Sequence, residues 1–178
     1  MSARKETTGH DVRHVVLVGA MGVGKTTLGT ALASRLGMRF LDSDVEIESC
    51  HGRTGAVIAR DDGVPALHEI ELAVFTEMAS SGESTVIAPA ASVADTDEGR
   101  RLLDEHITVW IHVPPEVARE RRDSGNHRRP VDFAEQQTRD ESRRRWLENL
   151  ADFEVDNNRA LELVIEEVVA KVTERLGN

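Results

Sequence analysis

A glycine-rich segment near the N-terminus carries the residues best suited to bind phosphate. Gly19-Ala-Met-Gly-Val-Gly-Lys25-Thr26 fits the pattern G-x-x-x-x-G-K-[ST]. Glycines let the backbone turn its N–H groups around phosphate oxygens, and the N-terminus of a following helix adds a favourable dipole. The Lys25 ammonium would reach the β- and γ-phosphates, and the Thr26 hydroxyl would ligate Mg²⁺. The segment predicts a site for ATP or GTP.

The elements on either side of this loop support that interpretation. Residues 14–18 form a short β-branched apolar run, and residues 26–36 show helical spacing of leucine and alanine, closed by Gly37. A strand, a glycine loop and a helix in this order favour a nucleotide site over a glycine-rich turn without a ligand. The nucleotide-binding residues are expected to be Gly22, Val23, Gly24, Lys25, Thr26 and Thr27.

Strand-like and helix-like segments alternate along the rest of the chain. Further strands are expected at residues 39–42, 84–88, 107–113 and 153–155. Helices are expected at residues 65–80, 97–105, 133–150 and 159–176, after Pro114-Pro115, and from Asp44 onward with breaks at Gly52 and Gly55. Short apolar strands separated by helices indicate a parallel sheet covered on both faces. The predicted fold is an α/β, P-loop NTPase-type three-layer sandwich of about five strands with a mobile lid.

Length and charge exclude several other classes of protein. The 178 residues suit one domain, assigned to residues 12–178, after a disordered polar tail at residues 1–11. The net charge of −10 and the aromatic content of 3% disfavour nucleic-acid binding. Cys50 has no partner for a disulfide, and no apolar run approaches the roughly 18 residues of a membrane span. A cytoplasmic protein, expected to be a monomer, is predicted.

Motifs downstream of the loop show which class of nucleotide-binding protein the sequence favours. No N-K-x-D motif of a GTPase is present, which leaves compact kinases with an arginine-rich lid. Here the chain resembles the shikimate kinase family. Phe40-Leu-Asp42-Ser-Asp44 is similar to its F-x-D-x-D element, and Arg122 followed by Arg129-Pro130 is similar to its adenine arginine and lid. Arg143, Ala151-Asp152 and Val155-Asp156 match its substrate arginine and the run downstream.

Two aspartates follow the second predicted strand, at the edge where open α/β sheets bind ligands. If residues 42–44 stay extended, both carboxylates point the same way. Asp42 is then suited to hold Mg²⁺, partly through water, and Asp44 to orient the acceptor hydroxyl and take its proton. The alternative is that one of the two caps the next helix.

Basic side chains gather in the predicted lid, at about residues 119–133. Arg129 could stabilise charge on the transferring phosphoryl group, and Arg122 could stack on adenine. Arg119 and Arg121 are better explained as a solvated helix face. Of Arg143-Arg144-Arg145, the family register selects Arg143 to bind a substrate carboxylate.

The acceptor half departs from the family pattern. The family's substrate arginine in its G-E-x-x-F-R-x-x-E element is replaced by His68, and its three consecutive glycines by Ala90, Ala91 and Ser92. Leu147 stands where the family usually has Tyr. We expect His68, Ala90 and Ala91 to contact the acceptor together with Asp44 and Arg143, in a rebuilt pocket.

The combined prediction is a phosphotransferase with an alcohol group as acceptor. It would use ATP and Mg²⁺ to phosphorylate a small polyol or cyclitol acid, with shikimate the leading candidate and Lys25, Asp44 and Arg129 as catalytic residues. One alternative is another secondary-metabolite or sugar-type acceptor. A second is a nucleotide-binding sensor or regulatory protein that has lost transfer activity. A nucleoside-monophosphate kinase is disfavoured because only Arg53 and Arg60 lie between residues 44 and 80.

Overall fold

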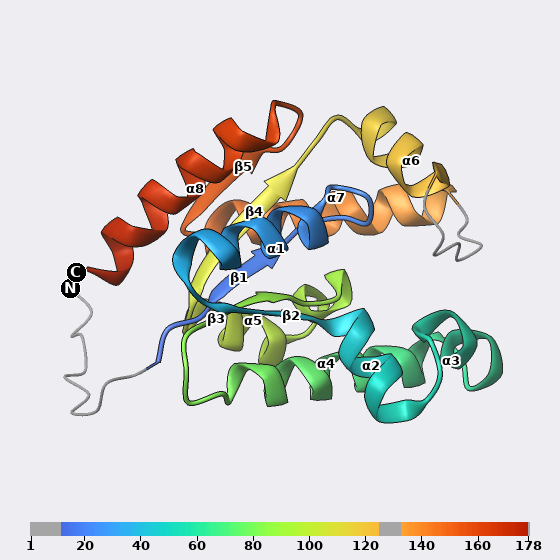
Figure 1. The fold of residues 1–178 in the computed structure, drawn as a ribbon. Helices are drawn as coiled ribbons and strands as arrows, with labels where there is room; N and C mark the ends of the chain where they lie inside the picture. The colour runs from blue at the N-terminus through green and yellow to red at the C-terminus, as the bar shows by residue number, and fades with distance from the viewer. Residues whose placement is uncertain (1–11, 125–132, 178) are drawn as a thin grey trace, which may run out of the picture.

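The computed structural model describes residues 12–124 and 133–177. Its centre is a parallel sheet of five strands in the order β2-β3-β1-β4-β5, which confirms the predicted α/β class (Figure 1). The strands are β1 (Val15–Val18), β2 (Arg39–Asp42), β3 (Thr85–Ala88), β4 (Ile107–His112) and β5 (Phe153–Asp156). Each strand boundary lies within one residue of the boundary expected from the sequence.

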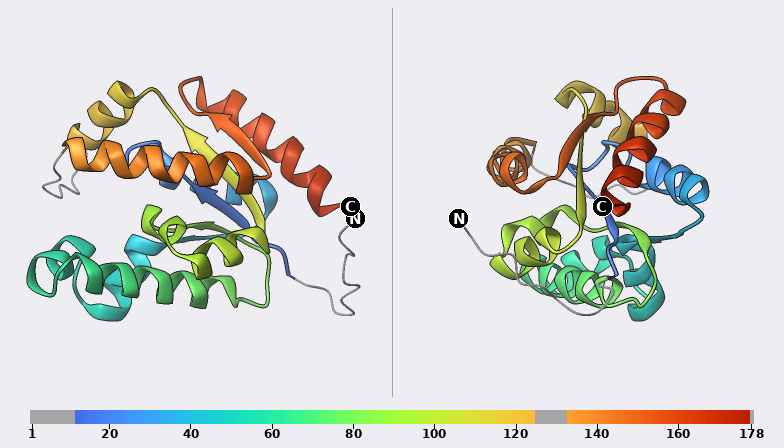
Figure 2. Two further views of the ribbon diagram at one scale, coloured as in Figure 1. Left: turned by 180° about the vertical axis from the view of Figure 1, so that it is seen from behind. Right: turned by 90° about the vertical axis from the view of Figure 1, so that its left-hand side faces the viewer.

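Helices cover both faces of the sheet. They are α1 (Lys25–Leu36), α2 (Ser43–His51), α3 (Gly55–Asp61), α4 (Val64–Ala79), α5 (Asp97–Asp104), α6 (Pro115–Ser124), α7 (Phe133–Leu150) and α8 (Leu161–Leu176), with a 3₁₀ turn η1 (Ala91–Asp95). Helices α1 and α8 lie on one side of the sheet, and α4, α5 and α7 lie on the other (Figure 2). The result is the predicted three-layer sandwich.

The alternating side chains of β1 show how one strand serves two cores. Val15 and Leu17 pack with Leu28 and Val168 of the helices on one face. Val16 and Val18 belong to the opposite core, with α4 and α5. Because side chains of a strand point alternately to its two faces, a wholly apolar strand requires cover on both sides.

Three local features differ from the sequence-based expectations. Gly55 is the first residue of α3 rather than a break, because the Thr54 hydroxyl accepts a hydrogen bond from Val57 N–H and starts the helix there. Helix α8 starts at Leu161, two residues later than Arg159. The η1 turn after β3 was not predicted, since its alanines carry no helix-start signal.

The sheet topology brings the segments after β1, β2, β3 and β4 to one edge. In a parallel sheet all carboxyl ends point the same way, and the loops that leave them form the ligand crevice. Here those loops are the glycine segment at residues 19–24, the β2–α2 junction, the segment leading into η1, and the entry to α6. This edge is where the candidate site lies.

Candidate active site

The phosphate loop, residues 19–26, joins β1 directly to the N-terminus of α1. Gly24 occupies the N-cap position with φ 93°, and no side chain caps the helix there. The first turn of α1 contains no acidic residue. The helix dipole and the uncapped N–H groups therefore face the loop without a competing carboxylate, which is the arrangement that binds phosphate.

Close packing behind the loop fixes its backbone. A Cβ at Gly22 would lie 2.3 Å from the Ala118 carbonyl oxygen of α6, and one at Gly24 would lie 2.6 Å from Asn157 Nδ2. That amide group donates a hydrogen bond to the Val23 carbonyl oxygen at 2.7 Å. The glycines are required here both by positive φ angles and by the lack of space for a side chain.

Asn157 is a loop-supporting residue that sequence reasoning missed. It is buried, and its own carbonyl oxygen accepts a hydrogen bond from Arg121 Nη2 at 3.2 Å. Arg121, expected from the sequence to lie on a solvated helix face, thus contacts the residue that supports the phosphate loop. The available signal was the position of Asn157 directly after Val155-Asp156, where β5 reaches the edge of the site.

Lys25 lies under the loop. Its ammonium donates hydrogen bonds to the carbonyl oxygens of Gly19 at 2.8 Å and Ala20 at 3.2 Å. Burial lowers the pKa of the Lys25 ammonium, and the negative charges of Asp44 and Asp42 oppose that effect. The charges of both aspartates therefore act on this cation, in addition to its burial.

The carboxylate of Asp42 connects the phosphate loop to helix α2. Its Oδ2 accepts a hydrogen bond from the Thr26 hydroxyl at 2.7 Å, and its Oδ1 accepts one from Asp44 N–H at 3.0 Å. Asp42 is the N-cap of α2. The same side chain therefore caps helix α2, as the alternative from the sequence expected, and also lies beside the Thr26 hydroxyl.

The condition that residues 42–44 stay extended is not met. The helix begins at Ser43, which places Asp44 in its first turn. The Asp42 cap satisfies an N–H group at this helix end, so the chain turns immediately after the strand. The charge of Asp44 still acts on Lys25. Its side chain, however, is oriented by the first turn of a helix and not by a strand, in which alternate side chains point the same way.

Thr26 and Asp42 fit a magnesium ion. Hydroxyl and carboxylate oxygens are the ligands that Mg²⁺ prefers, and it usually binds through one or two protein groups together with substrate phosphates and water. Within residues 12–124 and 133–177, no group of three or more His, Cys, Asp or Glu side chains could hold a metal ion. The candidate ligands thus suit a metal that arrives with nucleotide phosphates.

A cavity of about 410 Å³ adjoins the phosphate loop. Gly19, Ala20 and Met21 of the loop line it on one side, and Ala90 and Ala91 line it on another. Arg143, Arg122 and Leu147 also line it, whereas Asp44 and His68 are not among its lining residues. The structure therefore brings three of the predicted acceptor residues to one cavity.

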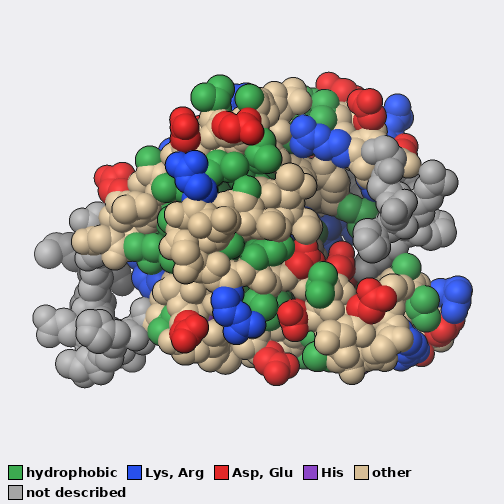
Figure 3. All heavy atoms as spheres, in the orientation of Figure 1, with side chains coloured by type: hydrophobic (Ala, Val, Ile, Leu, Met, Phe, Trp, Pro, Cys, Tyr) green, Lys and Arg blue, Asp and Glu red, His purple; other side chains and the backbone are tan. Residues whose placement is uncertain are grey.

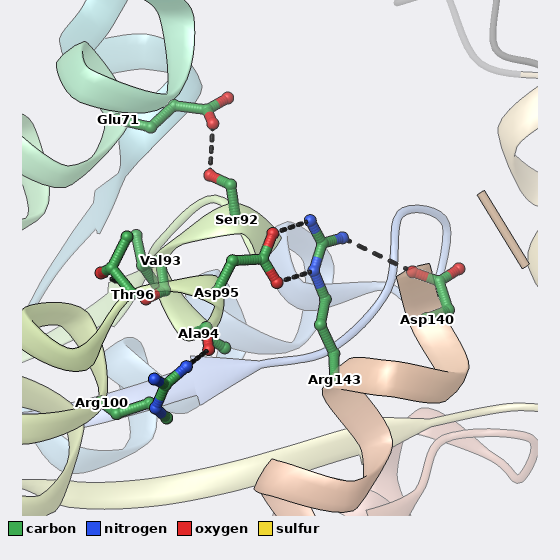
Figure 4. A network of polar contacts seen from close by, with 9 residues as sticks. All are labelled: Glu71, Ser92, Val93, Ala94, Asp95, Thr96, Arg100, Asp140 and Arg143. Carbon is green, nitrogen blue, oxygen red and sulfur yellow. Dashed lines mark hydrogen bonds and ion pairs between the residues drawn. The ribbon is translucent and has the colours of Figure 1, made fainter. Parts of the chain in front are cut away.

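Arg143 is the buried member of the three consecutive arginines. Its Nε and Nη2 donate to the two carboxylate oxygens of Asp95 at 2.9 and 2.6 Å, and its Nη1 lies 3.6 Å from Asp140 Oδ1 (Figure 4). Burial opposes the charge of the guanidinium, but hydrogen bonding and the charge of Asp95 outweigh it, so the pKa of Arg143 is raised. The pairing with Asp95, at the end of η1, was not predicted from the sequence.

Comparison with known proteins places the chain in a family. Residues 21–176 match the family model described as shikimate kinase. The chain belongs to the shikimate kinase family. It is 34% identical over 119 residues to a shikimate kinase of Symbiobacterium thermophilum, an alignment that covers 66% of this chain and 68% of that protein. It is 37% identical over 116 residues to one of Synechococcus elongatus, covering 65% of this chain and 60% of that protein.

The fold agrees with this family. A structure described as shikimate kinase from Acinetobacter baumannii in complex with shikimate superposes with a TM-score of 0.82 and 26% identity, covering 92% of this chain and 94% of the other. The resemblance drawn from the motifs is thereby confirmed, as are the P-loop kinase fold and the class of phosphotransferase that acts on a hydroxyl group.

The lid of this shikimate kinase family member is described in part. Arg129 and Pro130 lie outside the described residues, so the predicted phosphoryl-stabilising role stays a prediction. Arg122 of α6 lines the cavity, and its Nε lies 3.9 Å from an Asp123 carboxylate oxygen.

Figure 3 shows acidic and basic side chains interspersed over one face of the molecule. Among the described helices, none has the length and apolar character needed to cross a membrane.

Proposed function

We propose that the chain transfers the γ-phosphoryl group of ATP to a hydroxyl of a small polyol or cyclitol acid, with shikimate as the first acceptor to test. The observation that carries the proposal is the shared cavity. Loop residues Gly19 to Met21 and the candidate acceptor residues Ala91 and Arg143 line the same space. A phosphate donor on the loop and an acceptor beside Arg143 would therefore meet at one edge of the sheet.

The proposed roles at the donor side follow from the contacts of the loop. The N–H groups around Gly24 would bind the phosphates, and Lys25 would move from its loop carbonyl partners to the β- and γ-phosphates. Thr26 and Asp42 would hold Mg²⁺, partly through water. When bound, the ion would neutralise charge on the phosphate oxygens.

Acceptor activation is assigned to Asp44. Its carboxylate is exposed in the first turn of α2, and its negative charge opposes the lowering of the pKa of Lys25, which supports this role. It would accept a hydrogen bond from the acceptor hydroxyl and take its proton as the oxygen attacks phosphorus. Arg129 would stabilise the developing phosphoryl charge, and Arg122 would stack on adenine.

The oligomeric state, the cellular location and the partners of the chain are part of the same proposal. The chain would act as a monomer in the cytoplasm on small molecules, without a membrane partner. The net charge of −10 disfavours a nucleic-acid partner. A panel of hydroxyl acceptors in a coupled ADP-release assay, with shikimate and several uncharged polyols, tests the activity. Acceptor-dependent ADP formation supports the proposal. Tight ATP binding with no such ADP formation would instead favour a nucleotide-binding protein without transfer.

A further inference from the structure

The 3₁₀ turn η1 forms one wall of the cavity that adjoins the phosphate loop. Ala91, Val93 and Ala94 belong to this turn and line the cavity. No side chain caps its first residue, and the backbone hydrogen bonds at its two ends are long: 3.3 Å from Val93 N–H to the Ala90 carbonyl oxygen, and 3.4 Å from Thr96 N–H to that of Val93. Because a 3₁₀ turn has poor hydrogen-bond geometry of its own, the place of this wall depends on the helices around it.

Helix α5 packs directly against the turn. A Cβ at Gly99 would clash with the Val93 carbonyl oxygen, so the backbones of α5 and η1 are in close contact. The next residue, Arg100, donates a hydrogen bond from Nη1 to the Ala94 carbonyl oxygen at 2.7 Å (Figure 4), and its Nη2 pairs with the Asp97 carboxylate. Turn η1 and the start of α5 are thus joined into one unit.

The Arg100 side chain also attaches this unit to α7. Its Cζ atom lies 4.3 Å from the ring centroid of Trp146, so the guanidinium forms a cation–π contact with the indole. The Arg100 side chain is only 17% exposed, although the Asp97 carboxylate with which it pairs is fully exposed. One planar group therefore contacts η1, α5 and α7 at once.

A second link between η1 and α7 lies at the cavity itself. Arg143 of α7 donates two hydrogen bonds to the carboxylate of Asp95, the last residue of η1. Arg143 precedes Trp146 by three residues, and side chains at this spacing are neighbours on one side of a helix. The contact between Arg100 and Trp146 therefore holds α7 in the position that brings Arg143 to the cavity.

We infer that Arg100 is a positioning residue for the acceptor: it holds η1 against α7 and so sets the separation between the wall at Ala91 and the guanidinium of Arg143. The inference rests on the proposed function and adds to it a residue that does not itself line the cavity. The hydrogen bonds of Arg100 and its cation–π contact join it to elements on the acceptor side. Loss of this side chain should weaken acceptor binding and leave nucleotide binding unchanged.

The test measures the two ligands separately. In Arg100→Gln, calorimetry should show the Kd for shikimate raised about tenfold and the Kd for ATP within about twofold of the parent, since a charged hydrogen bond and a cation–π contact are lost on the acceptor side alone. In the coupled assay the KM for the acceptor should rise by a similar factor, with kcat within about threefold. Arg100→Lys retains the charge and a donor for the Ala94 carbonyl oxygen, and should recover part of the affinity.

Arg101→Gln is the matched control. It removes the same charge from the next residue of α5, where Arg101 is 64% exposed and pairs with Glu105 at 2.8 Å. We expect both Kd values to remain those of the parent. Trp146→Leu removes the cation–π contact and should raise the Kd for shikimate about threefold. The double variant Arg100→Gln/Trp146→Leu should bind no more weakly than Arg100→Gln, because the two residues act through one contact.

Three results would overturn the inference. Unchanged acceptor affinity in Arg100→Gln protein that thermal unfolding shows to be folded would mean that Arg100 stabilises the fold alone. Equal losses of affinity for shikimate and ATP would mean that the substitution loosens the whole site. A parent protein that binds no hydroxyl acceptor would overturn the inference together with the proposed function. Absence of ADP formation by a parent protein that still binds shikimate refutes the transfer alone, and the calorimetric comparison then still decides the role of Arg100.

Discussion

Replacing Asp42 would separate its capping of helix α2 from its proposed role in binding Mg²⁺. In Asp42→Ala, α2 loses its N-cap, at a cost of about 1 kcal/mol, and the Thr26 hydroxyl loses an acceptor, at a cost of about 0.5 kcal/mol. The free energy of unfolding should fall by about 1.5 kcal/mol, which lowers Tm by about 3 to 6 °C in a chain of this size. Asp42→Asn retains a capping oxygen and should lose about 0.5 kcal/mol or less.

The two variants should differ in stability but agree in metal dependence. Both remove the charge beside Thr26, so the Mg²⁺ concentration for half-maximal ADP release should rise by about tenfold or more. Urea unfolding and Mg²⁺ titrations of the coupled assay measure the two effects. Thr54→Ala, which removes the cap of α3, is the control that should lose stability without a change in metal dependence. An Asp42→Asn enzyme with the Mg²⁺ dependence of the parent would refute the metal role and leave only the cap.

Three further predictions concern the loop and a buried histidine pair. Lys25→Ala should reduce phosphoryl transfer by roughly 10³-fold or more and weaken ATP binding in calorimetry. Undiminished turnover would refute the proposal that Lys25 binds the β- and γ-phosphates. Gly24→Ala and Asn157→Ala should each raise the Kd for ATP by about tenfold, because the first forces a Cβ to 2.6 Å from the Asn157 amide and the second removes the support of the loop; unchanged affinity in both would contradict this packing argument. Burial and the neighbouring His14 lower the pKa of His106 to about 4, so the unfolded chain binds protons first as the pH falls. Unfolding free energy should therefore drop by about 2 kcal/mol between pH 7 and pH 4, with a smaller slope in His106→Gln; equal slopes in urea titrations would argue against it.

The fold was largely predictable because its signals are local. Runs such as residues 107–112 are apolar and short, and the helices between them show their own periodicity and end signals. The phosphate loop was predictable for the same reason, since its glycines, lysine and threonine act within one strand-to-helix connection. Residues 42–44 were harder, because an aspartate after a strand can continue it or cap a helix, and the sequence is compatible with both.

The candidate acceptor site was predicted only in part. The register of the family motifs selected Arg143, and the structure buries it at the cavity. His68 was expected beside the acceptor on the same motif evidence, yet it is not among the residues that line the cavity. Side chains on a helix such as α4 point to different faces, so the position of a residue in a motif does not fix which surface it reaches.

By itself, the sequence determined the parallel α/β sandwich, the phosphate loop and the presence of arginine clusters in an acidic chain. The tertiary structure decided which groups those basic residues meet. Arg143 and Asp95 are 48 positions apart, and Asn157 and Val23 are 134 apart. Such pairs form because the fold brings segments that are distant in the sequence to one edge of the sheet, where a buried charged or polar group must find its partner on another segment. The choice of partner depends on that arrangement in space, which no local pattern encodes.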